Sequence, residues 1–83
     1  MEKFDIIISS PPEGERPVAE IAYGYVQWAE VSQSSDGELV VEFYPHPKRD
    51  YWEFEFEETI QILEEARNEL LRAMTVGSFE DAF

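Results

Sequence analysis

The sequence predicts an α+β fold, namely a four-stranded antiparallel β-meander with one C-terminal α-helix packed on one face of the sheet. Three observations support this fold class. Up to residue 56, the chain consists largely of apolar stretches rich in residues that favour a pleated strand. Short segments of turn-forming residues separate several of these stretches, and short connections favour antiparallel pairing of consecutive strands. Residues 57–74 instead repeat their apolar side chains at helical spacing.

Residues 3–9 are expected to form the first strand, because Phe4, Ile6 and Ile8 fall on one face at a period of two residues. The following segment, residues 9–17, holds three prolines and a glycine and is therefore expected to be a loop. An alternative arrangement has three main strands, with residues 3–9 added at an edge of the sheet.

Residues 18–31 form the longest apolar stretch and are expected to be the second strand. Alanines in this stretch also permit a helix, but the Tyr23-Gly24-Tyr25 sequence favours a strand. Gly24 separates apolar residues of opposite parity, so it is a candidate β-bulge at which the strand exchanges the faces of its side chains. This interpretation allows Trp28 to lie on the outer face of the sheet.

The third strand is expected over residues 38–45, after a polar segment that ends in Asp36-Gly37, a hairpin signal. Its residues alternate, so that Glu42 and Tyr44 face away from its main apolar set. We expect this set to face the core; it consists of Leu39, Val41 and Phe43.

The fourth strand is expected over residues 51–56, where aromatic and acidic residues alternate. In a strand with this pattern, three aromatic residues point to the core and the intervening residues point outward. The inward-facing residues are Trp52, Phe54 and Phe56, and the outward-facing residues are Tyr51, Glu53 and Glu55.

Residues 57–74 are predicted to form the helix that covers the sheet, with Ile60, Leu63 and Leu70 as its main contacts. Gly77 is expected to end this helix as a C-terminal cap. Residues 1–76 then make a single α+β domain, and residues 77–83 form a short acidic tail.

The composition restricts the classes of partner. The chain has 19 Asp and Glu against 6 Lys and Arg, which gives a formal net charge of −13, although 43% of its 83 residues are hydrophobic. It therefore has the apolar mass to fold and presents a strongly negative surface. Such a surface repels nucleic acid and anionic membranes and attracts a basic protein. The N-terminal residues do not resemble a secretion signal, and no stretch is long enough to span a bilayer, which favours a cytoplasmic location.

No motif indicates catalysis, a cofactor or a metal, and we expect the chain not to be an enzyme. It has no cysteine, so it offers neither a thiol nucleophile nor a thiolate ligand. Residues 45–50 contain the single histidine, His46, without an obvious Ser or Asp partner. This segment is expected to be a rigid turn whose Lys48 and Arg49 neutralise nearby acids; the alternative is that it grips a phosphate or a carboxylate.

The predicted sheet leaves one face uncovered, and acidic and aromatic residues gather on it. Carboxylates interleaved with rings can pair with the Lys and Arg side chains of a basic protein and stack against them. We therefore expect a non-enzymatic interaction domain, for instance an antitoxin-type or immunity-type neutraliser or a nucleic-acid mimic. The expected partner-binding residues are Glu42, Tyr44, Tyr51, Glu53, Glu55 and Trp28, and Glu30 and Asp5 are expected to be able to join them.

Besides an enzyme with His46 or the carboxylates at its centre, two alternatives remain open. A merely solvated face of an antiparallel sheet also carries charged residues, although the aromatic residues favour binding. The other alternative is a homodimeric structural or accessory protein that uses the open sheet face or an edge strand. Repulsion between two copies of net charge −13 opposes such a dimer, so salt should strengthen it.

Overall fold

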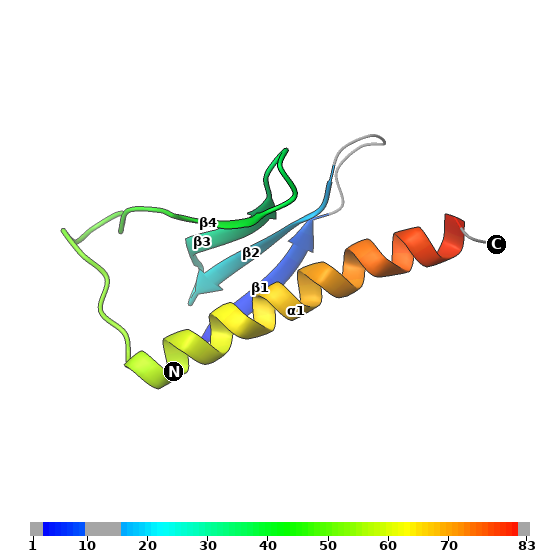
Figure 1. Cartoon of the computed structure of the whole chain (residues 1–83). Coiled ribbons are helices and arrows are strands. Elements are labelled where there is room, and N and C mark those ends of the chain that lie inside the picture. Colours follow the sequence, from blue (N-terminus) through cyan, green and yellow to red (C-terminus); the bar gives the residue numbers. More distant parts are fainter. Residues whose placement is uncertain (1–2, 10–15, 82–83) are drawn as a thin grey trace.

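A computed structural model describes residues 3–9 and 16–81, with side chains described as far as residue 74. In chain order it contains β1 (Phe4–Ser9), β2 (Val18–Tyr23), β3 (Val26–Gln33), β4 (Leu39–Phe43) and α1 (Phe56–Asp81). The four strands form one antiparallel sheet in the order β1-β2-β3-β4, and the helix packs on it (Figure 1). The predicted fold class is therefore confirmed, although two of the strands differ from those expected. Residues 10–15 of the predicted loop and residues 82–83 of the predicted tail lie outside the described residues.

The stretch predicted as one strand over residues 18–31 is in fact a hairpin. Tyr23 pairs with Val26, so that Gly24 and Tyr25 form a two-residue loop between β2 and β3. Gly24 has a φ of 66°, whereas Tyr25 does not have a positive φ. A positive φ at the first loop position alone is the pattern of a type II′ turn, which favours glycine there. The prediction of a bulge at Gly24 was therefore wrong.

The bulge lies instead at Trp28. Ile21 pairs with Ala29 but Ala22 pairs with Gln27, so that Trp28 is left without a partner on β2. An extra residue in one strand shifts the parity of its side chains. As a result the adjacent residues Trp28 and Ala29 are both buried, with exposed fractions of 5% and 0%. Trp28 therefore belongs to the core, and the expectation that it lies on the outer face was wrong.

The prediction of a fourth strand over residues 51–56 was also wrong, because residues 51–55 are not paired with the sheet. Glu55 acts as the N-cap of α1: its carboxylate accepts a hydrogen bond from the backbone N–H of Glu58 at 3.2 Å, and its carbonyl accepts one from that of Thr59 at 3.0 Å. Phe56 therefore begins the helix, and its side chain is 73% exposed.

The rings of Trp52 and Phe54 do pack against the core, although this segment does not pair as a strand. The Phe54 ring lies against the rings of Phe4, Tyr23 and Trp28, with centroid distances of 4.9, 4.9 and 5.2 Å. The Trp52 indole N–H donates to the carbonyl of Tyr44 at 2.9 Å and its ring stacks on Phe54. Trp52 and Phe54, which precede the helix, therefore add their rings to the core.

Among the described residues, the helix contacts β1, β2 and β3, and none of these contacts involves β4. Its buried side chains are those of Ile62, Ala66 and Leu70, which pack with buried residues of β2 and β3. The small side chains of Ala19, Ala29 and Ala66, all fully buried, let the helix approach the sheet closely. Leu70 is fully buried, as expected, and Leu63 is partly buried against the core.

Two details of the predicted helix need correction. Ile60 is 39% exposed and is not a main contact, because the buried face of α1 is turned toward Ile62 and Ala66. The helix also continues past Gly77 to Asp81, so Gly77 does not cap it.

We predict that Leu70→Ala lowers the free energy of unfolding by about 2–5 kcal/mol, because the truncation leaves a cavity beneath the helix. Leu71→Ala is the matched control, since Leu71 is 41% exposed and loses less buried area. Urea denaturation of both variants measures the difference. Equal losses at the two positions would show that the helix is rotated relative to the face described here.

Candidate functional site

The helix covers one face of the sheet, and no other helix occurs in the part of the chain described. The strand register places Glu20, Glu30 and Glu42 directly opposite one another on β2, β3 and β4. These three residues, called here the glutamate row, lie on the face away from α1. Directly opposed residues in antiparallel strands have Cα atoms about 4.5–5.5 Å apart, so the carboxylates are close neighbours.

Two neighbouring side chains form hydrogen bonds with the glutamate row. The amide of Gln27 donates to Glu20 Oε1 at 3.2 Å, and the Tyr44 hydroxyl donates to Glu30 Oε1 in a long hydrogen bond of 3.4 Å. Among residues 3–9 and 16–74, no Lys or Arg side chain forms an ion pair with these glutamates. Like charges directly opposite one another destabilise a sheet, so the row is a local cost to folding.

The glutamate row affects the pKa of Tyr44. Partial burial and the nearby Glu30, Glu42 and Glu20 carboxylates raise the pKa of its hydroxyl above the usual value of 10.0. The raised pKa means that the folded state favours the neutral phenol. The corresponding contribution to stability is complete below pH 10 and is lost as the pH rises through the pKa of the folded state.

Only two of the six expected binding residues lie together on the outer face, namely Glu42 and Tyr44. Glu30, which was expected to be able to join them, lies at the centre of the row. Trp28 is in the core. Tyr51, Glu53 and Glu55 belong to the connection between β4 and α1, where Glu55 caps the helix.

Sequence reasoning missed Glu20. Its place beside Glu30 depends on the hairpin at Gly24-Tyr25 and on the bulge at Trp28, neither of which was predicted. The signal that could have revealed the hairpin is a glycine at the first position of a two-residue loop between apolar stretches.

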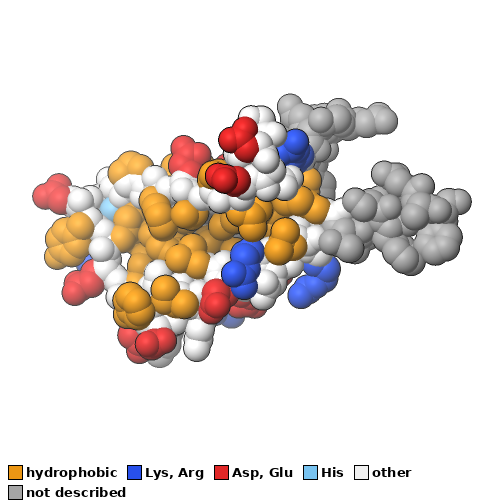
Figure 2. Space-filling model, viewed as in Figure 1, with side chains coloured by type: hydrophobic (Ala, Val, Ile, Leu, Met, Phe, Trp, Pro, Cys, Tyr) orange, Lys and Arg blue, Asp and Glu red, His pale blue; other side chains and the backbone are white. Residues whose placement is uncertain are grey.

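A second feature is the apolar side of β4. Because the helix does not reach this strand, its core-facing residues Val41 and Phe43 remain 42% and 56% exposed. On the helix, Phe56 and Ile60 are exposed as well. Figure 2 shows hydrophobic side chains gathered between the sheet and the helix on the side where β4 lies. We call Val41, Phe43, Phe56 and Ile60 the apolar strip.

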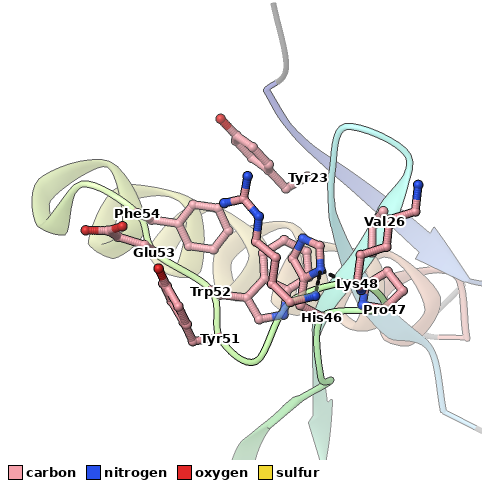
Figure 3. Close-up of a pocket in the computed structure, with 10 residues that line it drawn as sticks. Tyr23, Val26, His46, Pro47, Lys48, Tyr51, Trp52, Glu53 and Phe54 are labelled. Carbon is pink, nitrogen blue, oxygen red and sulfur yellow. Dashed lines mark hydrogen bonds between the residues drawn. The ribbon is translucent and has the colours of Figure 1, made fainter.

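A third feature is a cavity of about 340 Å³ formed by the connection after β4 together with Tyr23 and Val26 (Figure 3). His46 organises it: its Nδ1 accepts hydrogen bonds from the backbone N–H groups of Lys48 and Arg49 at 3.0 and 3.1 Å. The His46 ring also packs on Trp52, with centroids 4.5 Å apart. Residues 46–49 therefore form a tight turn around the imidazole. Both hydrogen bonds to its Nδ1 come from the backbone of this turn.

The lining of this cavity includes His46, Lys48, Arg49 and Glu53. Its lining contains no Ser, Thr or Cys, and the described residues contain no group of three His, Asp or Glu able to hold a metal ion.

Within the described chain, no helix has the length and apolar character needed to cross a membrane. Comparison of the chain with protein-family models, with curated proteins and with solved structures gives no match.

We predict that Tyr44 ionises above pH 10.0, because burial and the glutamate row favour its neutral form. The difference between the ultraviolet titration curves of the wild type and of Tyr44→Phe isolates this transition. In Glu30→Gln the transition should move to lower pH, since one neighbouring negative charge is removed. Ionisation of Tyr44 at or below pH 10.0 in the wild type contradicts the described environment.

Proposed function

We propose that this chain is a small non-enzymatic protein-binding domain that recognises a basic partner through its outer sheet face. The observation that supports this function is the glutamate row, in which three carboxylates on neighbouring strands have no Lys or Arg partner among the described residues. A sheet face selected only for stability would not place like charges directly opposite one another.

A basic side chain from a partner relieves the repulsion within the row. A Lys or Arg placed over Glu30 interacts with the flanking Glu20 and Glu42 at the same time, so that one cation offsets several unfavourable contacts. The Tyr44 ring lies beside these carboxylates, where an Arg guanidinium can stack on it. The net charge of −13 would also accelerate the encounter with a basic protein.

The concrete forms of this function are neutralisation of a basic protein, as in antitoxin-type or immunity-type proteins, and mimicry of nucleic acid toward a nucleic-acid-binding protein. Neighbouring carboxylates across a sheet repeat at about 4.8 Å and form a short line of negative charge. We place this activity in the cytoplasm as part of the same proposal.

The test compares two triple variants with the same change in net charge. Glu20→Gln, Glu30→Gln and Glu42→Gln neutralise the row, whereas Asp36→Asn, Glu64→Gln and Glu65→Gln neutralise exposed acids elsewhere. Each variant is immobilised, and proteins retained from extract of the native cells at low salt are identified by mass spectrometry. We expect the row variant to lose the basic protein that the wild type and the control variant retain.

Thermal unfolding of the same variants separates lost binding from lost structure. The row variant should melt no lower than the wild type, because the substitutions remove like-charge repulsion. Retention of the same basic protein by all three chains would contradict the proposal, as would failure of the wild type to retain any basic protein specifically.

A further inference from the structure

We infer that the basic partner docks on β4 as an additional β-strand, through an extended segment in which apolar and basic residues alternate. This inference rests on the proposed function and adds the geometry and the chemistry of the partner segment. Addition of a strand to an exposed sheet edge is an established mode of peptide recognition, in which backbone hydrogen bonds provide affinity and alternate side chains provide specificity.

Among the described residues, no strand pairs with the outer edge of β4. Two hydrogen bonds show which opposite residues of β3 and β4 form hydrogen-bonded pairs. Tyr44 N donates to Trp28 O at 2.9 Å, and Ser34 N donates to Glu38 O at 2.7 Å. Hydrogen-bonded and non-hydrogen-bonded pairs alternate in antiparallel strands. In the register observed, the peptide groups of Val40 and Glu42 are therefore directed to β3. Those of Leu39, Val41 and Phe43 are directed away from the sheet.

One side of an added strand would face the apolar strip. Val41 and Phe43 point to the helix side of the sheet but are 42% and 56% exposed, because α1 stops short of β4. Side chains of a neighbouring strand on this side would lie beside them, on the face of the sheet where Figure 2 shows exposed hydrophobic side chains. Apolar side chains at alternate positions of the partner would be buried there.

The other side of an added strand would face the glutamate row. Glu42 lies at the edge of the sheet and is exposed, and Glu30 and Glu20 follow it inward. A Lys or Arg at the next position outward would extend this row with opposite charge, which stabilises a cross-strand pair. Charge complementarity thus favours basic residues at the positions between the apolar ones.

The first strand does not offer the same opportunity. β1 is the other edge of the sheet, but its core-facing residues Phe4, Ile6 and Ile8 pack against the core, and the helix contacts this strand. A second copy of the chain is also a poor match for β4, because β4 carries Glu42 and no basic residue. Two copies would bring together two net charges of −13.

The test uses two fluorescent heptapeptides of identical composition. The first is Lys-Val-Lys-Val-Lys-Val-Lys, and the second has its lysines and valines in two blocks. Fluorescence anisotropy measures the affinity of the wild-type chain for each. We expect the alternating peptide to bind at least about tenfold tighter, because only alternation satisfies both faces of β4 at once. Equal affinity for the two peptides overturns the inference.

A substitution at the edge then tests the backbone contacts. Val41→Pro removes one outward N–H and leaves the hydrogen bonds to β3 intact, and Val41→Thr is the matched control that retains the N–H. Val41→Pro should lose most of the preference for the alternating peptide, whereas Val41→Thr should keep it. Preserved binding by a folded Val41→Pro overturns strand addition, although the proposed function would stand if the row variant still failed to bind.

Modified peptides provide a second measurement that does not depend on the folding of a variant. One copy of the alternating peptide is N-methylated on its valines and another on its lysines. Because amides of alternate residues point to opposite edges of a strand, only one of the two sets would face β4. One methylated peptide should therefore lose binding and the other should retain it, and equal binding of both overturns the inference. If the row variant binds as the wild type does, the proposed function fails as well.

Sedimentation equilibrium of the unbound wild type tests the competing occupant. A monomer at low and high salt leaves β4 available to the partner, as inferred. A salt-strengthened dimer that is abolished by Val41→Pro places a second copy on this edge and overturns the inference.

Discussion

The structure depends on the packing of one helix face against three of the four strands. Ile62, Ala66 and Leu70 lie over the centre of the sheet, where Ala19, Ile21 and Ala29 are fully buried. Complete burial of a single large side chain such as Leu70 or Ile21 contributes about 1.5–3 kcal/mol. This is a large fraction of the 5–15 kcal/mol expected for the net stability of a natural domain. With one helix available in the described chain, the opposite face and the outermost strand are left to solvent.

The features that support a binding function follow from this incomplete cover. The face without a helix carries the glutamate row, and the strand that the helix does not contact carries Val41 and Phe43 of the apolar strip. Both meet at β4, whose outward peptide groups are not used by β3. Side chains of opposite character on the two sides of one free edge define a binding site more specifically than a negative net charge alone. The glutamate row also places part of the acidic charge of the chain on a defined face of the sheet.

The sequence predicted the fold class because the periodicities of the first strand and of the helix are strong. Alternation at Phe4, Ile6 and Ile8 identified β1, and the spacing of apolar residues after residue 57 identified the helix. The parity of Glu42 and Tyr44 within one strand placed both correctly on the outer face. These predictions depend on local patterns that the sheet and helix preserve.

The remaining differences arise where tertiary packing decides between equivalent local patterns. The hairpin at Gly24-Tyr25 is flanked by apolar residues on both sides, so no polar break marks it, and the bulge at Trp28 reverses the parity that follows. Trp52 and Phe54 alternate with polar residues as in a strand, yet the segment is not paired with the sheet. Its Phe54 ring packs on Phe4 and Trp28, and its Trp52 ring stacks on Phe54. Glu20 was missed because its neighbours across the sheet depend on both features.

Amide hydrogen exchange in the unbound protein tests whether the outer edge of β4 is open. Nuclear magnetic resonance resolves the exchange of individual backbone amides, and exchange is slow for amides held in stable hydrogen bonds. The described pairing predicts slow exchange at Glu42 and Tyr44, which donate to β3, and fast exchange at Val41 and Phe43, which face away from it. Equal protection of all four amides would show instead that this edge is already covered.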